Sequence, residues 1–187
     1  MNSKKDKTTR AFIALDFPDE VIKEIARLHP LINKQSFTGK LTELENLHLT
    51  LKFLGEIDNS RLTKVKTALS KISFPKFQAK LQEAGTFSYN KKPKIAWIKI
   101  GGKETYDLQK VIDNSLKDLL PKEERFMSHL TIARIKYTKD NQAFTDYIKK
   151  LSVKPIAFLI TEFKLMSSEL KPMGPVYETI ESYGLKE

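Results

Sequence analysis

The sequence contains the tetrapeptide His48-Leu49-Thr50-Leu51, and the same pattern returns as His129-Leu130-Thr131-Ile132. Both copies lie in apolar surroundings, and the alternation of a β-strand would place histidine and threonine on one face and the aliphatic residues on the other. A strand that buries its aliphatic face would therefore present an imidazole and a hydroxyl together. Two such strands side by side predict a cradle for a phosphate group, flanked by an acid and a base.

The segments before and after the first motif predict alternating strands and helices. A short strand over 11–15 is followed by a helix from Pro18 to about Leu31, because proline suits the first turn of a helix. After a polar loop, the first motif strand should run from His48 to Leu54 and stop at Gly55. A helix capped by Ser60 should then reach about residue 72.

The rest of the chain predicts a hairpin of strands 77–87 and 95–100, a helix over 104–120, the second motif strand, a helix over 142–151, and strands over 156–167 and 176–183. This order favours an α+β fold with two pseudo-symmetric lobes, in which antiparallel or mixed sheets carry helices on the outside. We expect a groove between the lobes. Residues 10–187 would form this single domain, and residues 1–9 a flexible basic tail.

Composition limits the classes of protein to which the chain can belong. The 187 residues are 40% hydrophobic, which is enough for a core, and they contain no long uninterrupted apolar stretch. The first ten residues lack the apolar segment of a secretion signal, so we expect a cytoplasmic protein without membrane contact. Cysteine is absent, which excludes disulfides and thiolate metal sites.

The charge balance is strongly basic. Lys and Arg number 33 against 23 Asp and Glu, a formal net charge of +10. This excess favours a polyanionic partner such as RNA. The alternative is a solvated basic surface that only aids solubility, since part of the excess lies in the N-terminal tail and in residues 91–94.

The histidines must be weighed as structural residues, metal ligands and catalysts. A lone strand histidine is usually structural, but the recurrence of the motif favours chemistry for His48 and His129, whereas His29 lacks the pattern and is interpreted as structural or exposed. A zinc site normally needs three protein ligands, and neither motif offers cysteine or a carboxylate at short spacing. Threonine hydroxyls are good donors to phosphate oxygens. We therefore predict a site without a metal ion or other cofactor.

At this level of detail the chain resembles the two-histidine phosphoesterase superfamily, and within it the RNA 2',3'-cyclic phosphodiesterases, or 2'-5' RNA ligase-like proteins of the ThpR/LigT type. The resemblance rests on the segments 10–15, 46–55 and 126–134 and on the closing segments 166–170 and 174–177. It therefore runs nearly from end to end of the chain. Ser128 stands where relatives usually have proline, and a tryptophan often found shortly before the first motif is missing.

The resemblance implies a bilobal fold, both histidines facing a central groove, and metal-independent opening of RNA 2',3'-cyclic phosphate ends to 2'-phosphates, with 2'-5' ligation as the reverse reaction. By analogy His129 would be the base and His48 the proton donor, while Thr50 and Thr131 would hold the phosphate oxygens. Two imidazoles and two hydroxyls also meet the chemical needs of this reaction, which are a base, an acid and donors to the phosphorane.

Contacts beyond the phosphate are open to alternatives. Phe12 would either stack on a base or belong to the core, and Arg134 would offer a guanidinium platform if the strand ends or bulges after Ile132. Lys52 falls on the histidine face or is a solvated lysine. Two other functions compete: a phosphodiesterase for a small cyclic nucleotide or ADP-ribose cyclic phosphate, and a non-catalytic RNA-binding domain. We expect a monomer.

Overall fold

The computed structural model describes residues 8–172 and 174–187. Its elements in chain order are β1 (Thr8–Leu15), α1 (Asp19–Asn33), β2 (Phe37–Leu41), the 3-10 helix η1 (Leu44–Asn46), β3 (Leu49–Asp58), α2 (Asn59–Leu69), β4 (Phe77–Tyr89), β5 (Lys92–Gly101), α3 (Lys103–Ser115), β6 (His129–Thr138), α4 (Asn141–Lys149), β7 (Ala157–Ile160), β8 (Glu162–Lys171) and β9 (Gly174–Gly184). The expected tail lies outside the described residues, except that Thr8 and Thr9 already pair with β3 as the start of β1.

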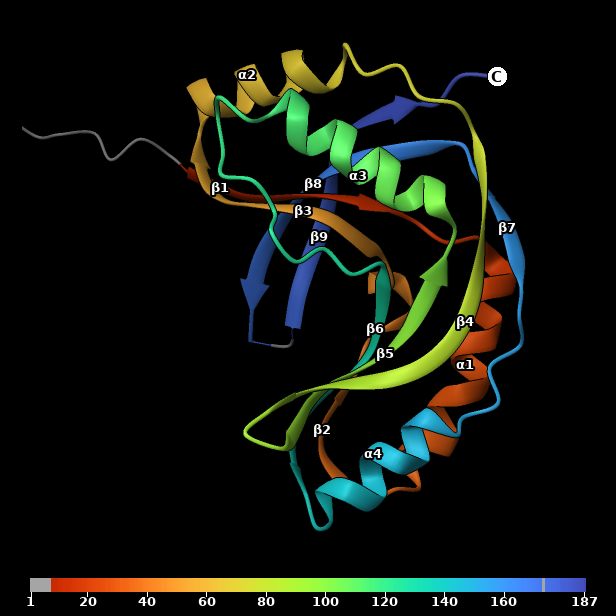
Figure 1. The fold of residues 1–187 in the computed structure, drawn as a ribbon. Coiled ribbons are helices and arrows are strands. Elements are labelled where there is room, and N and C mark those ends of the chain that lie inside the picture. Colours follow the sequence, from red (N-terminus) through yellow and green to blue (C-terminus); the bar gives the residue numbers. More distant parts are fainter. Residues whose placement is uncertain (1–7, 173) are drawn as a thin grey trace, which may run out of the picture.

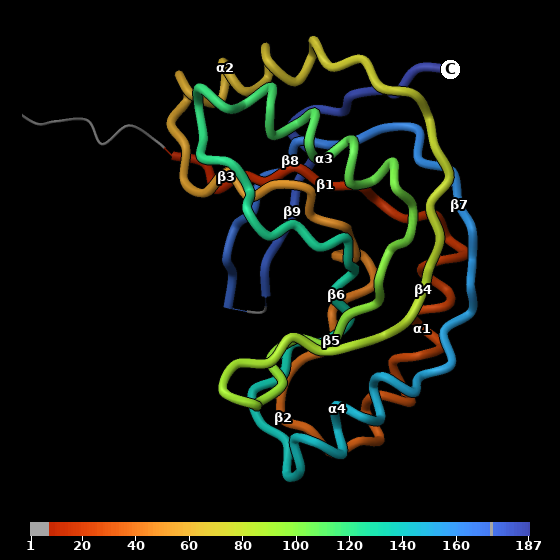
Figure 2. The backbone as a smooth tube through the Cα atoms, viewed as in Figure 1, coloured from red at the N-terminus to blue at the C-terminus, as the bar shows by residue number. Residues whose placement is uncertain are grey.

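The strands form two antiparallel sheets, which confirms the predicted α+β fold. One sheet has the order β3-β1-β8-β9, and the other the order β2-β6-β5-β4-β7. Helices α2 and α3 cover the first sheet, and α1 and α4 cover the second, as Figure 1 shows. The helices thus lie on the outside, and the backbone trace shows the two sheets meeting near β3 and β6 (Figure 2).

The chain crosses from one sheet to the other several times, and the crossing after β7 corrects a prediction. The segment expected as a single strand over 156–167 is divided into β7, which pairs with β4, and β8, which pairs with β1. The buried positions change phase at Thr161, from Phe158 and Ile160 to Phe163 and Leu165, which marks the change of sheet that the prediction overlooked. Helix α3 also ends at Ser115, earlier than predicted.

Two further differences concern strands near the first motif. The expected polar loop contains the edge strand β2, which pairs with β6 and was missed because its three middle residues are exposed. Strand β3 does not stop at Gly55 but continues to Asp58, since Gly55 adopts a φ of 72° within a bulge. The side chain of Asp58, rather than Ser60, caps α2 by accepting a hydrogen bond from the backbone of Arg61.

The aliphatic residues of both motifs belong to the core. Leu49, Leu51, Leu130 and Ile132 are at most 1% exposed. Their burial fixes the strands so that the alternate residues face the space between the sheets. In the described part of the chain, no helix combines the length and the apolar character that a membrane span needs.

Candidate active site

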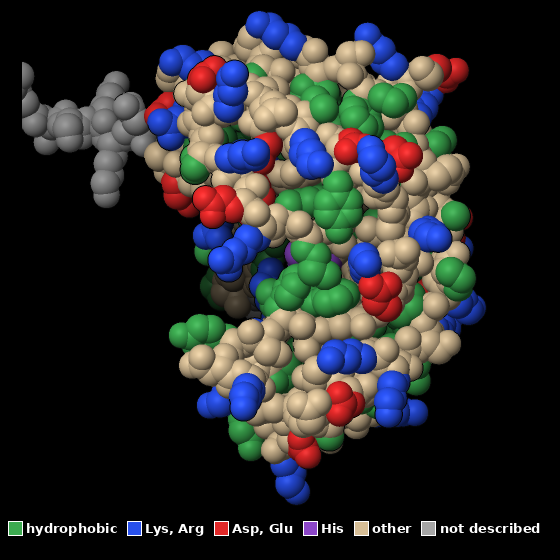
Figure 3. Space-filling view, in the orientation of Figure 1, with side chains coloured by type: hydrophobic (Ala, Val, Ile, Leu, Met, Phe, Trp, Pro, Cys, Tyr) green, Lys and Arg blue, Asp and Glu red, His purple; other side chains and the backbone are tan. Residues whose placement is uncertain are grey.

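A cavity of about 990 Å³ opens between the two sheets. Figure 3 shows a hollow on this side of the molecule, with basic side chains at its rim. The cavity is lined by residues of both sheets, and these include all six residues that the sequence singled out for catalysis or substrate binding: Phe12, His48, Thr50, His129, Thr131 and Arg134. His29 lies on α1 and is not among the lining residues.

The two histidines are held in the same way. His48 Nδ1 lies 2.8 Å from the backbone oxygen of Asn46, and His129 Nδ1 lies 2.7 Å from that of Met127, in each case two residues earlier in the chain. Because a carbonyl oxygen only accepts hydrogen bonds, each Nδ1 must carry the proton. The Nε2 atom of each ring is therefore the one available to accept or donate a proton in a reaction.

Aromatic rings support both imidazoles. Phe12 and Tyr177 lie against His48, with ring centroids 4.9 and 5.1 Å away, and Phe87 lies 4.9 Å from the ring of His129 in an edge-on arrangement. Tyr177 and Phe87 come from β9 and β4, far from either motif in sequence. Sequence reasoning missed them because no local pattern links them to the histidines.

Burial lowers the pKa of both His48 and His129, because the low-dielectric surroundings disfavour the charged imidazolium. The backbone carbonyl on Nδ1 acts in the opposite direction at each ring. Nearby charges add smaller effects: Arg134 lowers the pKa of both rings, while the carboxylate of Asp16 raises that of His48. Arg134 is thus close enough to influence both histidines.

A β-bulge follows the threonine in both motif strands. In β6 the pairing with β5 skips Ile132, and in β3 the pairing with β1 skips Leu51, the residue at the same motif position. Each bulge reverses the alternation beyond it. The bulge on which the Arg134 prediction depended is therefore confirmed, and Arg134 returns to the cavity side as an exposed residue.

The bulge in β3 overturns two expectations from simple alternation. Alternation leaves Lys52 on the histidine face or in solvent. Lys52 still borders the cavity, but its side chain is 3% exposed and its ammonium lies 2.5 Å from a carboxylate oxygen of Asp113. Unbroken alternation from Leu49 and Leu51 would also place Phe53 on the buried face, but Phe53 is 67% exposed and lines the cavity. The alternation failed here because the extra residue shifts its phase by one.

Phe12 has little free surface. It is 3% exposed, and its ring is in contact with His48, Tyr177 and Phe53. Of the two interpretations of Phe12, the buried position favours the core residue, which supports the imidazole from behind. Phe53, on the other hand, offers an exposed aromatic face at the edge of the same cavity.

The charge of the cavity suits an anion. Its lining contains five cationic side chains (Arg10, Lys40, Lys52, Arg125 and Arg134) and three carboxylates (Glu43, Glu56 and Glu123). Some of these charges are paired, since Lys40 contacts Glu43 and Lys52 contacts Asp113. Among the residues that the structure describes, no group of three or more His, Cys, Asp or Glu side chains could hold a metal ion.

Comparison with known proteins assigns this arrangement to a family. The family model described as LigT like phosphoesterase matches residues 15–97 and 101–177. The chain belongs to this family. It is 33% identical to the RNA 2',3'-cyclic phosphodiesterase of Methanocaldococcus jannaschii over 93% of its own length and 99% of that protein, and 32% identical to the protein of the same name from Thermotoga maritima over 91% and 92%.

A solved structure agrees with this membership. The protein TT0787 of Thermus thermophilus superimposes on this chain with a TM-score of 0.80 at 25% identity, covering 95% of this chain and 98% of that protein. The predicted resemblance to the two-histidine phosphoesterases is therefore confirmed, along with the antiparallel two-sheet architecture.

Proposed function

We propose that this LigT-like phosphoesterase opens the 2',3'-cyclic phosphate at the end of an RNA and leaves a 2'-phosphate. The observation that carries the proposal is the pair of imidazoles that face one cavity, each with Nδ1 bound to a backbone carbonyl and Nε2 left for proton transfer. The names of the Methanocaldococcus jannaschii and Thermotoga maritima relatives support the same activity.

The reaction needs one proton taken and one proton given. His129 would accept a proton from water as the water oxygen bonds to phosphorus. The bond between phosphorus and O3' then breaks, and His48 would protonate O3'. The hydroxyls of Thr50 and Thr131, which line the cavity beside the histidines, would donate to the non-bridging oxygens as negative charge builds there.

The charges around the two rings support this assignment of acid and base. The carboxylate of Asp16 favours the protonated form of His48, which is the form that a proton donor needs at the start. Arg134 disfavours protonation of both rings, so the carboxylate of Asp16, which acts on His48, is the charge that distinguishes the two. Burial lowers the pKa of both rings, so the negative phosphate of the substrate would be needed to stabilise the protonated His48.

Contacts outside the phosphate would come from the two residues that the bulges turn toward the cavity. Arg134 would lie near the phosphate and the terminal ribose, since it already acts on both imidazoles. The exposed ring of Phe53 would offer a stacking surface for a base. Both motifs belong to one chain, so a monomer would contain the complete site.

The deciding experiment is incubation of the protein with an oligonucleotide that ends in a 2',3'-cyclic phosphate, followed by identification of the product. We expect a 2'-phosphate, formed equally well after exhaustive EDTA treatment. Loss of turnover that zinc or magnesium restores would instead make the histidines metal ligands. A 3'-phosphate product would mean that O2', rather than O3', is the leaving group.

A phosphodiesterase for a small cyclic phosphate is the second candidate, because the cavity is large enough for a mononucleotide alone. Salt distinguishes the two. If the net charge of +10 helps to bind an RNA chain, raising the salt concentration should weaken the binding of an oligonucleotide substrate far more than that of a cyclic mononucleotide. A mononucleotide has few phosphates and so releases few counterions when it binds. Equal salt dependence would favour the small substrate, and RNA binding without any turnover would favour a non-catalytic domain.

A further inference from the structure

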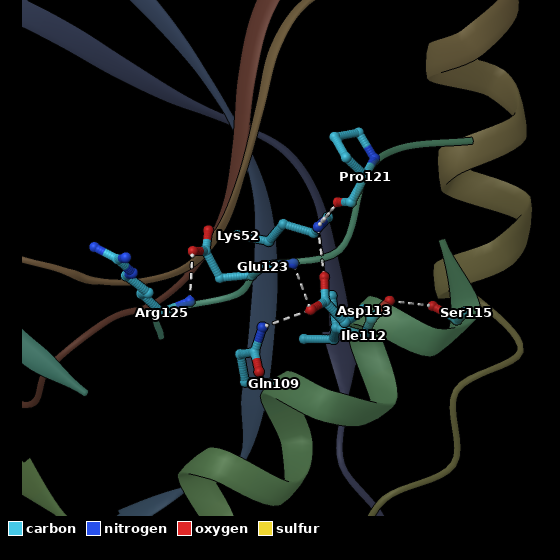
Figure 4. A network of polar contacts seen from close by, with 8 residues as sticks. All are labelled: Lys52, Gln109, Ile112, Asp113, Ser115, Pro121, Glu123 and Arg125. Atoms are coloured by element: carbon cyan, nitrogen blue, oxygen red, sulfur yellow. Dashed lines mark hydrogen bonds and ion pairs between the residues drawn. The ribbon is translucent and has the colours of Figure 1, made fainter. Parts of the chain in front are cut away.

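A buried ion pair connects the first motif strand to the segment that leads into the second motif. The ammonium of Lys52, four residues after His48, contacts Asp113 of α3 at 2.5 Å, and the two side chains are 3% and 1% exposed. Figure 4 shows Lys52 and Asp113 at the centre of a polar network with the residues that follow α3. Lys52 lies on the four-stranded sheet, whereas the chain after α3 enters the five-stranded sheet as β6.

The pair holds the irregular segment 116–128 at two points. Lys52 also donates to the backbone oxygen of Pro121 at 2.7 Å, and the second carboxylate oxygen of Asp113 accepts the backbone N–H of Glu123 at 2.9 Å. Gln109 donates to that same oxygen at 3.2 Å and completes the carboxylate's set of partners. Four residues beyond Glu123, the backbone oxygen of Met127 accepts the hydrogen bond from His129.

The corresponding carbonyl of the first motif is fixed differently. The oxygen of Asn46 lies at the end of the 3-10 helix η1, whose turn is closed by a hydrogen bond from the backbone of Asn46 to Glu43 at 2.9 Å. Residues 121–128 have no helix or strand to do this. The backbone oxygen of Ser128 accepts from Ile100 at 3.1 Å and fixes the end of this segment. Between α3 and that point, the side chains of Lys52 and Asp113 hold the backbone at Pro121 and Glu123.

We propose that Lys52 and Asp113 are positioning residues that hold the Met127 carbonyl, and through it the ring of His129, in a fixed relation to the strand of His48. This role requires no contact with the substrate: Lys52 borders the cavity, but its ammonium donates to Asp113 and to the backbone oxygen of Pro121, and Asp113 is 1% exposed. The effect on turnover rests on the function proposed above. The effect on the His129 ring does not.

The test compares two double variants. K52M/D113L replaces the ion pair with apolar side chains, a change that buried pairs often tolerate without loss of stability. E24Q/R27M is the matched control: Glu24 and Arg27 also form an ion pair, and they hold the backbone of Lys154 and Ser152 in a similar way, but none of these residues lines the cavity. D113N is a second variant that keeps the shape of the side chain: an amide has one oxygen and one NH2 group, so it cannot accept at both positions that Lys52 and the Glu123 N–H occupy, and it leaves the Lys52 ammonium without its counter-charge.

The pKa of each histidine is measured by NMR titration of the imidazole carbons. The Met127 carbonyl raises the pKa of His129, so loosening it in K52M/D113L should lower that pKa while the pKa of His48 stays unchanged. If the proposed activity holds, kcat should fall about 10- to 100-fold with little change in KM, as for a misplaced catalytic group. The control variant should change neither the titration nor kcat.

Several outcomes would overturn the proposal. Folded K52M/D113L and D113N proteins with an unchanged His129 titration would show that the pair does not position the ring, and equal shifts at both histidines would show a general effect on the fold. If neither variant folds, the pair serves stability rather than positioning. A wild type without turnover but with the selective His129 shift would refute the proposed function and leave the positioning role standing.

Discussion

In β3 the bulge brings Lys52 into the interior and Phe53 to the cavity, whereas in β6 the same bulge brings Ala133 into the interior and Arg134 to the cavity. Up to that point the two strands are equivalent in sequence, in burial and in the hydrogen bond on each histidine. Beyond it, one strand offers an aromatic ring and the other a guanidinium. The duplicated part would therefore serve the two non-bridging phosphate oxygens, which are nearly equivalent. The divergent part would place an aromatic ring on the side of the base and a cation on the side of the phosphate and ribose.

The largest effect should come from the histidines. We expect H48A and H129A each to lower kcat by about 100- to 10,000-fold, because each removes one proton transfer. The double variant should be scarcely slower than either single one, since the acid and the base act in one step. Rapid-quench assays with a cyclic-phosphate oligonucleotide measure this, and multiplicative losses would mean that the two rings do not act together.

Thr50 and Thr131 test whether the symmetry extends to the hydroxyls. T50V and T131V keep the shape of the side chain and remove one donor, and each should cost about 1–3 kcal/mol of transition-state stabilisation, roughly 5- to 150-fold in kcat. Equal losses would support equal contacts with the two non-bridging oxygens. A normal rate in either variant would remove that threonine from the site, and S128A, beside the second motif, serves as the control.

Variants of Phe53 and Arg134, the residues that differ between the two strands, should affect different parts of the substrate. F53A should remove a stacking interaction worth about 1 kcal/mol and so raise the KM for a cyclic nucleotide roughly fivefold. The KM for an abasic ribose cyclic phosphate, which has no base to stack, should not change. R134M should raise KM for both substrates, because a guanidinium near the phosphate acts whether or not a base is present. The same pattern for both variants would contradict the division of roles proposed here.

The smallest effect concerns stability against pH. Burial lowers the pKa of His48 and His129 in the folded protein, whereas the unfolded chain has imidazole pKa values near about 6.5. The unfolded state therefore binds protons first as the pH falls, so the free energy of unfolding is largest above that value and decreases below it. H48Q/H129Q should lose less stability than the wild type between pH 7.5 and 5.5 in urea titrations. Parallel losses would show that the rings titrate alike in both states.

Much of this arrangement could be predicted from the sequence because it depends on local periodicity. The aliphatic residues of the two motifs place the histidines and threonines on one face of each strand. For Arg134 to reach the cavity, the strand had to end or bulge after Ile132, and the structure has a bulge at Ile132. The equivalent bulge in β3 was not inferred. A bulge depends on pairing with another strand, so the burial of Lys52 and the exposure of Phe53 could not be derived from β3 alone.

The remaining differences also arise from contacts between distant segments. Tyr177 and Phe87 reach the histidines only because β9 and β4 are placed there by the sheets. The edge strand β2 has few apolar residues, and its extended form follows from pairing with β6. In the sequence, Asp113 is one charged residue on an amphipathic helix. Its partner Lys52 becomes evident only when that helix is packed against β3.

The hydrogen bonds on the two Nδ1 atoms have a consequence for successive turnovers. Because each ring has its own carbonyl, neither can release its Nδ1 proton in the reaction, and one Nε2 proton serves the pair. Hydrolysis in the proposed direction would move that proton from His48 to His129 without changing the net charge of the enzyme. The product state is then the starting state for the reverse step, in which O3' attacks phosphorus again and water leaves, so water must carry the proton back before the next hydrolysis, and both directions should share one pH optimum.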